Sequence, residues 1–523
     1  MKKIKILLMS ALALGLASCD MDKEPYDQIP ATEALETPTD FSNMSVSLYT
    51  GLRSSVGGQL WTAPELQCDG FNAISGDNSG LADFYRWDFT TSAGAVETAY
   101  GNFQALIARA NFIIDGYNKC DMSDETEFTP EAVASVKNIK GEAFFIRSYA
   151  LFGLAQYFCK AYNNDIADEA NSGVSYRTDY APSSEVSTYP ARKTMRQTYK
   201  QITDDLDSAA LYVTHVGDGV NNRYISTNAI KALRARVALA MGEYQTAINE
   251  AVDLIESGDY SLARNSVELR DMWQNDGGTE CILQLAVTNL TELPAQLGDI
   301  FQPYDEGGLV SIVPTKTLVD LYSDNDYRKV VYFNQNTFQT NTGPRRTLIC
   351  LNKYIDQTAI YQQFQNEYAR FCIEPKVFRI AEMYLIAAEA YAQLGDFQEG
   401  SKYLNTLLSY RGVNLNGAEN VDPETGVNKG GYGTQSITSA STLMSKIRDE
   451  RQREMVCEGT RLFDLKRWNM DVVRGVPQDE SLCYQPGTNT TELRRSAGDN
   501  RFVWPIPRAE MDANPNVVQN EGY

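Results

Sequence analysis

Few side chains in this sequence combine the types and the spacing that catalysis needs. The chain has one histidine, His215, which excludes H-E-x-x-H metalloenzymes and any site with two histidine ligands. A Ser-His-Asp triad would have to use His215, which lies in a predicted loop at a helix end. The P-loop, G-x-G-x-x-G and G-x-S-x-G motifs of NTPases, dinucleotide enzymes and hydrolases are missing from the sequence. We therefore do not expect an enzyme.

One charged stretch, RDERQREMVCEGTRLFDLKRW, could still act through paired carboxylates. Glu454 and Glu458 would lie one helical turn apart on one face, whereas the two carboxylates of a glycosidase flank the sugar from opposite sides. A structural role fits the spacing better. The stretch predicts a charged network where a helix meets the following turn, formed by Arg451, Glu454, Glu458, Arg461, Asp464 and Arg467.

Sugar binding requires different side chains, and these are concentrated between residues 61 and 104. Aromatic rings stack on the apolar faces of a sugar, while amide, carboxylate and guanidinium groups bond its hydroxyls. Residues 57–93 show no helical period, so we expect a loop there. The candidate ligand-binding residues are Trp61, Asp69, Asn72, Asp77, Asn78, Tyr85, Arg86, Trp87 and Tyr100. Packing in the interior is the alternative for each ring.

The cysteines give neither a zinc nor a redox signal. No two of the nine stand in a C-x-x-C spacing, and the count is odd. Several lie in apolar helical contexts, where free buried thiols are expected. Cys19 stands apart from these because of its place near the start of the chain.

The first residues have the features of a lipoprotein signal peptide, 1–18. A basic start, KKIK, precedes an apolar run that is too short to stay in a bilayer as a span. The run ends in Leu16-Ala17-Ser18-Cys19, which resembles the bacterial lipobox. That resemblance implies cleavage before Cys19 and its acylation, and two or three acyl chains give stable anchoring. The alternative is an ordinary signal peptide with an incidental cysteine. Residues 19–40 are expected to form a flexible tether, because they are polar and acidic.

Composition and charge narrow the possible partners. With 523 residues, 43% of them hydrophobic, and a formal charge of −21, this is a globular and strongly acidic chain. Nucleic acid and basic-patch attachment to anionic lipid are therefore not expected, since both require positive charge.

The elements that would position a binding site are helices in pairs. Pro130 and the apolar residues after it predict a long helix, and residues 194–213 place Tyr199, Ile202, Leu206, Ala209 and Val213 on one face. Two segments around Gly242 and Gly395 both read G-[DE]-[FY]-Q-x-[AG], which resembles the turn of a tetratricopeptide helix pair. Loop-rich insertions are expected at 57–93, 161–193, 259–375 and 411–440, and such loops on a helical scaffold commonly carry binding groups.

Four stretches, taken in order, resemble the SusD/RagB family of Bacteroidetes outer-membrane lipoproteins. They are KGEAFFIRSYALFGLAQYFCKAY, FRIAEMYLIAAEAYAQLGDF, IRDERQREMVCEGTRLFDLKRW and VWPIPRAEMDANPNVVQNEGY, and the last closes the chain. The resemblance implies an all-α dominated fold of about four tetratricopeptide-like helix pairs with loop-rich, partly β insertions. It divides the chain into an N-terminal region at 41–258, an inserted ligand-binding region at 259–375 and a C-terminal region at 376–523.

The same resemblance implies a function. Family members are non-catalytic glycan-binding lipoproteins that act as a lid on a SusC-like TonB-dependent transporter, and some relatives take peptides instead. It also implies further ligand contacts from the insertion, for which the candidates are Trp273, Phe301, Tyr304 and Tyr322. The acidic run Asp20, Asp22 and Glu24 resembles the family's signal for export to the cell surface. No cofactor is expected, although Asp422 and Glu424 would permit a structural calcium ion. A glycosidase and a pure scaffold for a partner protein are the alternatives.

Overall fold

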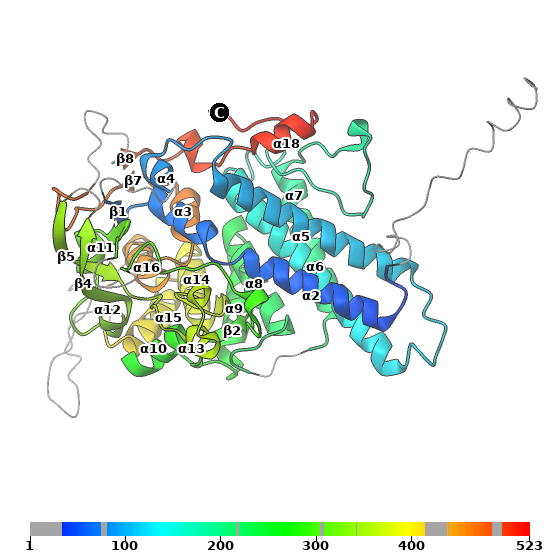
Figure 1. Cartoon of the computed structure of the whole chain (residues 1–523), viewed down its shortest axis with the longest axis horizontal. Coiled ribbons are helices and arrows are strands. Elements are labelled where there is room, and N and C mark those ends of the chain that lie inside the picture. Colours follow the sequence, from blue (N-terminus) through cyan, green and yellow to red (C-terminus); the bar gives the residue numbers. More distant parts are fainter. Residues whose placement is uncertain are drawn as a thin grey trace, which may run out of the picture.

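The computed structural model describes residues 34–74, 81–215, 219–303, 308–340, 343–413, 437, 439–483 and 494–523 (Figure 1). Helices dominate this part of the chain, as predicted. They are α2 (Pro38–Ser54), α3 (Gln59–Gln67), α4 (Ala82–Arg86), α5 (Gly94–Lys119), α6 (Pro130–Phe158), α7 (Met195–Tyr212), α8 (Thr227–Met241), α9 (Tyr244–Glu256), α10 (Ser266–Gln274), α11 (Lys316–Asp320), α12 (Tyr327–Tyr332), α13 (Ala359–Phe364), α14 (Ile380–Gln393), α15 (Phe397–Tyr410), α16 (Ala440–Glu454), α17 (Arg461–Arg467) and α18 (Arg508–Ala513).

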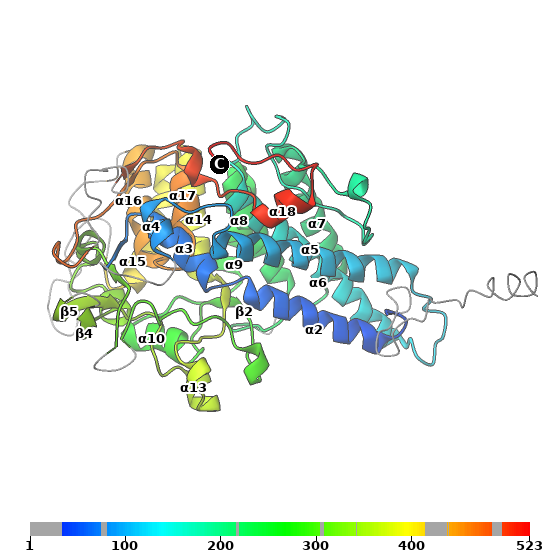
Figure 2. The ribbon, with the colours of Figure 1, turned by 45° about the horizontal axis from the view of Figure 1, so that its top comes forward.

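The long N-terminal helices form one end of the molecule, and the short elements of the insertion gather at the other (Figures 1 and 2). Helix α6 begins at Pro130 as predicted, and the side chain of Thr129 caps it by accepting a hydrogen bond from the amide of Ala132. Helix α6 packs between α5 and α7. The predicted apolar face of α7, together with the residue that caps the helix, is buried, so the 3.6-residue period identified the correct face. Its members are Tyr199, Ile202, Leu206, Ala209 and Val213.

The two glycine turns join helix pairs as predicted. Gly242 links α8 to α9 with a φ of 76°, and Gly395 links α14 to α15 with a φ of 86°. A residue with a side chain is strained in this left-handed region, whereas glycine is not. Helix α14 also packs against α9, which makes the two pairs neighbours in space although they are far apart in sequence. Gly400 is the small residue after the second turn, and it is buried. A Cβ atom added to Gly400 would lie only 2.7 Å from the carbonyl oxygen of Ala388.

Two predicted boundaries were wrong. The segment 57–93 is not a loop throughout, since it contains α3, strand β1 (Phe71–Ala73) and α4. Helix α3 is only nine residues long and contains Pro64, so it shows little apolar period, yet it is almost entirely buried. The tether ends before residue 40, because a capping box between Thr37 and Asp40 starts α2 at Pro38.

Short antiparallel strands lie in the insertion at 259–375, which is partly β as predicted, and in segments that pack beside it. Besides β1 they are β2 (Cys281–Gln284), β3 (Ile312–Pro314), β4 (Phe333–Thr340), β5 (Gly343–Leu351), β6 (Lys376–Arg379), β7 (Val472–Val473) and β8 (Arg494–Arg495). They pair as β1 with β3, β2 with β6, β4 with β5 and β7 with β8. In the hairpin β4–β5, Phe333 lies opposite Leu351. Strand β6 runs directly into α14, so the β2–β6 pair joins the insertion to the helical scaffold.

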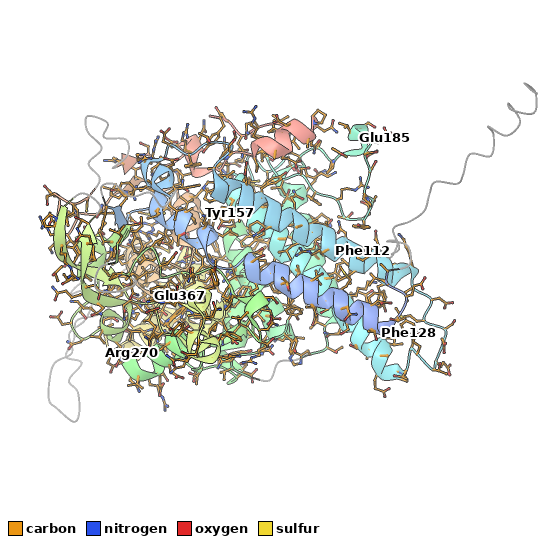
Figure 3. The ribbon with its side chains drawn as sticks, in the orientation of Figure 1. Phe112, Phe128, Tyr157, Glu185, Arg270 and Glu367 are labelled. Atoms are coloured by element: carbon orange, nitrogen blue, oxygen red, sulfur yellow. The ribbon has the colours of Figure 1, made fainter. Side chains whose placement is uncertain are left out.

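The last residues of the chain pack into a slot formed by much earlier segments. The Trp504 ring lies 4.7 Å from the ring of Tyr157, which is labelled in Figure 3, and its indole N–H donates to Oε1 of Gln67 at 2.7 Å. Arg192 donates to Oδ1 of Asn520 at 2.7 Å. The C-terminal segment thus holds α3, α6 and the loop before α7 together.

The eight cysteines in the described ranges are free, and all but Cys120 are buried, which agrees with the predicted free thiols. Within these same ranges no helix combines the length and the apolar character that crossing a membrane requires.

Candidate ligand-binding site

The structure brings together the two segments that were predicted to supply ligand contacts. Strands β1 and β3 pair antiparallel, with Asn72 opposite Val313. Beside them the rings of Phe71 and Phe301 lie 5.3 Å apart. Of the predicted site residues, Cys19, Asp77, Asn78 and Tyr304 lie outside the described residues, as do Asp20, Asp22, Glu24, Asp422 and Glu424.

The aromatic residues of the first segment lie mostly in the interior. Tyr85 is 1% exposed; its hydroxyl accepts a hydrogen bond from the buried amide of Asn72 at 3.2 Å, and the guanidinium of Arg474 lies 4.0 Å from its ring centroid. Trp87 is also 1% exposed and packs against Phe502. Tyr100 is buried edge-on to Phe158. These positions agree with the packing alternative, and ligand contact through these rings stays a prediction.

The insertion's described candidates are equally enclosed. The ring of Trp273 is 1% exposed and meets the ammonium of Lys353 at 4.2 Å and the ring of Tyr354 at 5.7 Å. Phe301 is buried, and so is Tyr322, whose hydroxyl donates to the carbonyl oxygen of Arg453 at 2.8 Å. These three rings are part of the core, and ligand contact through them stays a prediction.

Three predicted residues remain accessible. Trp61 is half-buried and lines a cavity of about 120 Å³, together with Phe103, Tyr149 and Phe463. Asp69 accepts a hydrogen bond from Nη2 of Arg461 at 2.7 Å. Arg86 forms an ion pair with Asp83 on the surface.

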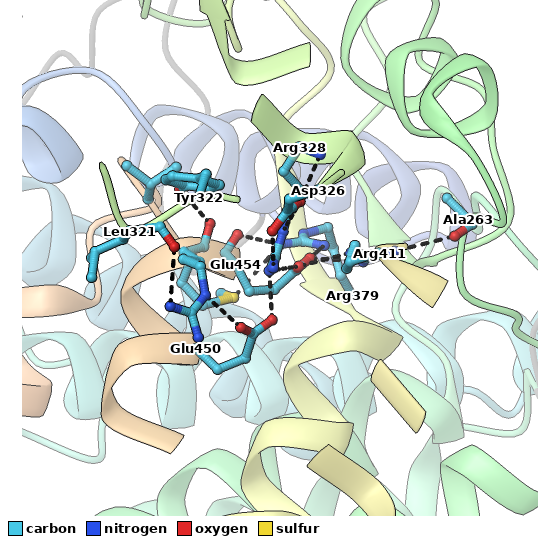
Figure 4. A network of polar contacts seen from close by, with 12 residues as sticks. Ala263, Leu321, Tyr322, Asp326, Arg328, Arg379, Arg411, Glu450 and Glu454 are labelled. Atoms are coloured by element: carbon cyan, nitrogen blue, oxygen red, sulfur yellow. Dashed lines mark hydrogen bonds and ion pairs between the residues drawn. The ribbon is translucent and has the colours of Figure 1, made fainter. Parts of the chain in front are cut away.

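The predicted charged network exists, and it is centred on Glu454 (Figure 4). The carboxylate of Glu454 accepts hydrogen bonds from Arg328 at 2.9 Å, from Arg379 at 3.0 Å and from Arg411 at 2.8 Å. Burial alone would raise the pKa of Glu454, but Arg411 and Arg379 outweigh it and hold that pKa well below its ordinary value. The other predicted members pair nearby: Arg379 with Glu458, Arg451 and Arg467 with Asp464, and Arg461 with Asp69.

The network ties the C-terminal helices to the insertion. Glu454 ends α16, whereas its three arginines come from α12, β6 and the end of α15. The sequence indicated which stretch is charged but not these distant partners. Glu454 and Glu458 are fully occupied by buried cations, which is a geometry for holding segments together rather than for reaching a sugar.

The surface chemistry expected of a sugar site is found elsewhere, in a groove of about 700 Å³. Five segments form its walls: the chain after α6, the turn between α8 and α9, the end of α14, the end of α17 with the residues after it, and residues 498–503. Three half-buried aromatic residues and five polar amide residues line it. They are Tyr162, Tyr244 and Trp468, with Asn163, Asn164, Gln393, Asn469 and Asn500.

Several groove side chains are held in place by the scaffold. The indole N–H of Trp468 donates to Oε1 of Glu389 at 2.7 Å, and Arg467 lies 4.7 Å from its ring centroid. Tyr162 packs edge-on against Tyr199. The ammonium of Lys466 donates to the carbonyl oxygen of Cys159 at 2.9 Å, and burial lowers the pKa of Lys466 to about 8.

Sequence reasoning missed the groove because no single segment contains it. Tyr162 and Trp468 stand at the ends of two family-like stretches that were interpreted as purely structural. The one available signal was an aromatic residue next to an asparagine, in Tyr162-Asn163-Asn164 and in Trp468-Asn469. The groove and the cavity beside Trp61 share three lining residues, Leu239, Ala240 and Arg467. Trp61, a predicted ligand-binding residue, therefore lies in a cavity next to the groove.

Comparison with known proteins agrees with this architecture. A family model described as "SusD family" matches residues 329–523, and one described as "Starch-binding associating with outer membrane" matches residues 21–239. "SusD-like protein P38" of Formosa agariphila is 23% identical over 100% of this chain and 99% of its own length.

Solved structures show the same fold. A SusD superfamily protein of Bacteroides thetaiotaomicron has a TM-score of 0.72 at 24% identity and covers 92% of this chain and 99% of its own. A putative sugar binding protein of Bacteroides vulgatus has a TM-score of 0.72 at 25% identity and covers 94% of this chain and 99% of its own. The fold and the two matches together show that the chain belongs to the SusD/RagB family.

Proposed function

We propose that this protein is a non-catalytic lipoprotein of the outer membrane that captures glycans on the cell surface. It passes them to a SusC-like TonB-dependent transporter, over which it closes as a lid. Membership of the SusD/RagB family supports this role, and so does the description of the second family model, which names starch binding and the outer membrane.

The groove of Tyr162, Tyr244 and Trp468 is the observation that carries the proposal. A sugar ring offers apolar C–H faces to aromatic rings and hydroxyls to amides, which donate and accept at once. Within the described residues, the side chains of Tyr244, Asn469 and Asn500 make no hydrogen bond to protein, so their polar groups are available to a ligand. A volume of about 700 Å³ is large enough to hold an oligosaccharide.

To act as a lid, the folded part of the protein must be tethered to the membrane without being embedded in it. Acylation of Cys19, which lies outside the described residues, would supply the tether and hold the groove close to a membrane partner. The buried ion pairs of Glu454 and Glu458 support capture without hydrolysis.

Calorimetry against a panel of neutral and acidic oligosaccharides tests the proposal. We expect binding to at least one glycan, an affinity about tenfold weaker in Tyr244→Ala, and a smaller loss in Gln393→Ala, because a stacking contact contributes about 1 kcal/mol or more. Tyr368→Ala is the matched control, since Tyr368 is 78% exposed and lies outside the groove. Binding to peptides alone would change the substrate class, and turnover of a bound oligosaccharide would refute the non-catalytic role.

A further inference from the structure

Three buried polar atoms near the first predicted site segment have no hydrogen-bond partner among the described residues. They are Oε1 of Glu65, Nη1 of Arg451 and Nη1 of Arg461. Glu65 is 4% exposed on α3 and Arg451 is 5% exposed on α16, while Arg461 begins α17. An unpaired polar atom in the interior costs about 1–3 kcal/mol, so three of them in one place require an explanation.

The three residues line the same small void. Its volume is about 10 Å³, and its walls also include Phe71, Leu318 and Met455. A void of roughly 10–15 Å³ with two to four polar neighbours is what one buried water molecule needs. The void is therefore the size of a single water.

The hydrogen-bonding capacity of the three residues also matches one water. Arg451 already donates through Nε to Asp464 at 2.7 Å, and Arg461 already donates through Nη2 to Asp69 at 2.7 Å. Each guanidinium therefore has its charge compensated and an N–H left over at Nη1. A water molecule accepts two hydrogen bonds and donates two.

We propose that one structural water molecule is bound in this void, accepting from Nη1 of Arg451 and Nη1 of Arg461 and donating to Oε1 of Glu65. An anion fits less well, because the two arginines are already paired with Asp464 and Asp69. Burial raises the pKa of Glu65 to about 8, against the effect of Arg461, so at neutral pH the site contains no unpaired negative charge.

The water connects three helices through atoms that have no other hydrogen-bond partner in the described part of the chain. It links α3 to α16 and α17, and α3 leads directly into β1, which pairs with the insertion at β3. The bound water thus orders the segment 65–74, which contains β1 of the β1–β3 pair.

A crystal structure of the full protein at a resolution that shows ordered water tests this inference. We expect a solvent peak within about 3.2 Å of all three atoms, and the same peak in Glu65→Gln, which keeps the acceptor oxygen. In Glu65→Leu the peak should be lost, and amide hydrogen exchange in residues 65–74 should become faster than in Glu65→Gln. A bromide soak should give no anomalous signal there.

Two results would overturn the inference. One is direct contact between the three side chains with no solvent peak, and the other is an anomalous bromide peak in the void. The wild-type crystals and Glu65→Gln decide the question even if Glu65→Leu does not fold.

Discussion

The ammonium group of Lys353 lies 4.2 Å from the centroid of the Trp273 indole, in the interior of the protein. It also donates to Oε1 of Glu458 at 2.6 Å and to the carbonyl oxygen of Val456 at 2.9 Å. Tyr332 provides a second ring at 4.7 Å. A buried cation is thus stabilised by one carboxylate, one carbonyl and two aromatic faces. The electron-rich face of Trp273 is therefore in contact with Lys353 of the same chain.

Replacing this lysine should destabilise the protein strongly. In Lys353→Met, Glu458 stays buried with one cation fewer and Trp273 loses its ring contact, so we expect the free energy of unfolding to fall by about 3 kcal/mol or more. Urea unfolding measures it. The control is Lys316→Met, which removes an ion pair with Asp320 in which both side chains are more than half exposed, and a change below about 1 kcal/mol is expected there. Equal changes in the two variants would contradict this account.

Glu142 should make stability depend on pH. It is buried on α6, accepts a hydrogen bond from Nδ2 of Asn138 at 3.0 Å, and burial raises its pKa to about 7. The folded protein therefore binds this proton more tightly than the unfolded chain does. The resulting stability is complete below pH 4.5 and is lost as the pH rises through 7, by about 3 kcal/mol in total.

The variant Glu142→Gln should remove this slope. Urea unfolding between pH 4.5 and 8 should show the wild type losing stability relative to the variant as the pH rises. Glu125→Gln, on the exposed loop before α6, is the control and should follow the wild type. Parallel curves for the wild type and Glu142→Gln would show that Glu142 does not titrate in this range.

A comparison of alanine variants at Gly459 and Gly395 should distinguish the cost of backbone strain from the cost of a steric collision. Gly459 has a φ of 71°, and an added Cβ would lie 2.5 Å from Cδ1 of Trp61, whereas Gly395 has a φ of 86° and open space around it. Alanine at either position pays about 1–2 kcal/mol for the left-handed backbone. Gly459→Ala should lose a further 1–3 kcal/mol or so through the collision. Thermal or urea unfolding of both variants gives the difference, and no difference would mean that Trp61 moves freely.

Cys19 should determine where the protein is found in the cell. If Cys19 carries the lipid, Cys19→Ala should release the protein from the membrane fraction while its circular dichroism and unfolding midpoint stay unchanged. Fractionation of cells that express each form measures this. Firm membrane attachment of the variant would show that something other than the lipid holds the protein.

The sequence predicted most accurately the features that depend on neighbouring residues, such as helix starts and turns. Thr129 and Pro130 start a helix by capping, and Gly242 and Gly395 turn the chain because only glycine is unstrained there, so these features were correct. Whether an aromatic ring is buried depends on residues far away in the chain. Trp87 and Tyr322 lie in segments whose composition is typical of a binding loop, yet both side chains are in the core. No local pattern in the sequence shows that they are buried.

The candidate site was harder to predict for the same reason. The charged stretch around Glu454 was recognised, but its partners Arg328, Arg379 and Arg411 come from three other elements. The groove requires five segments to meet, and its residues are unremarkable within each one. The β1–β3 pair places part of the segment 61–104 beside part of the insertion 259–375, which no local pattern in the sequence indicated.

The slot that receives Trp504 has a consequence for the timing of folding. Gln67 and Tyr157 contact Trp504, and 437 residues separate Trp504 from Gln67 in the chain. Contacts between segments so far apart in the chain form slowly, since a long loop must close first. Helices α3 and α6 therefore complete their packing only when residue 504 has joined them. A variant truncated before residue 503 should therefore leave an apolar slot open between α3 and α6, and we expect proteases to degrade it faster than the wild type.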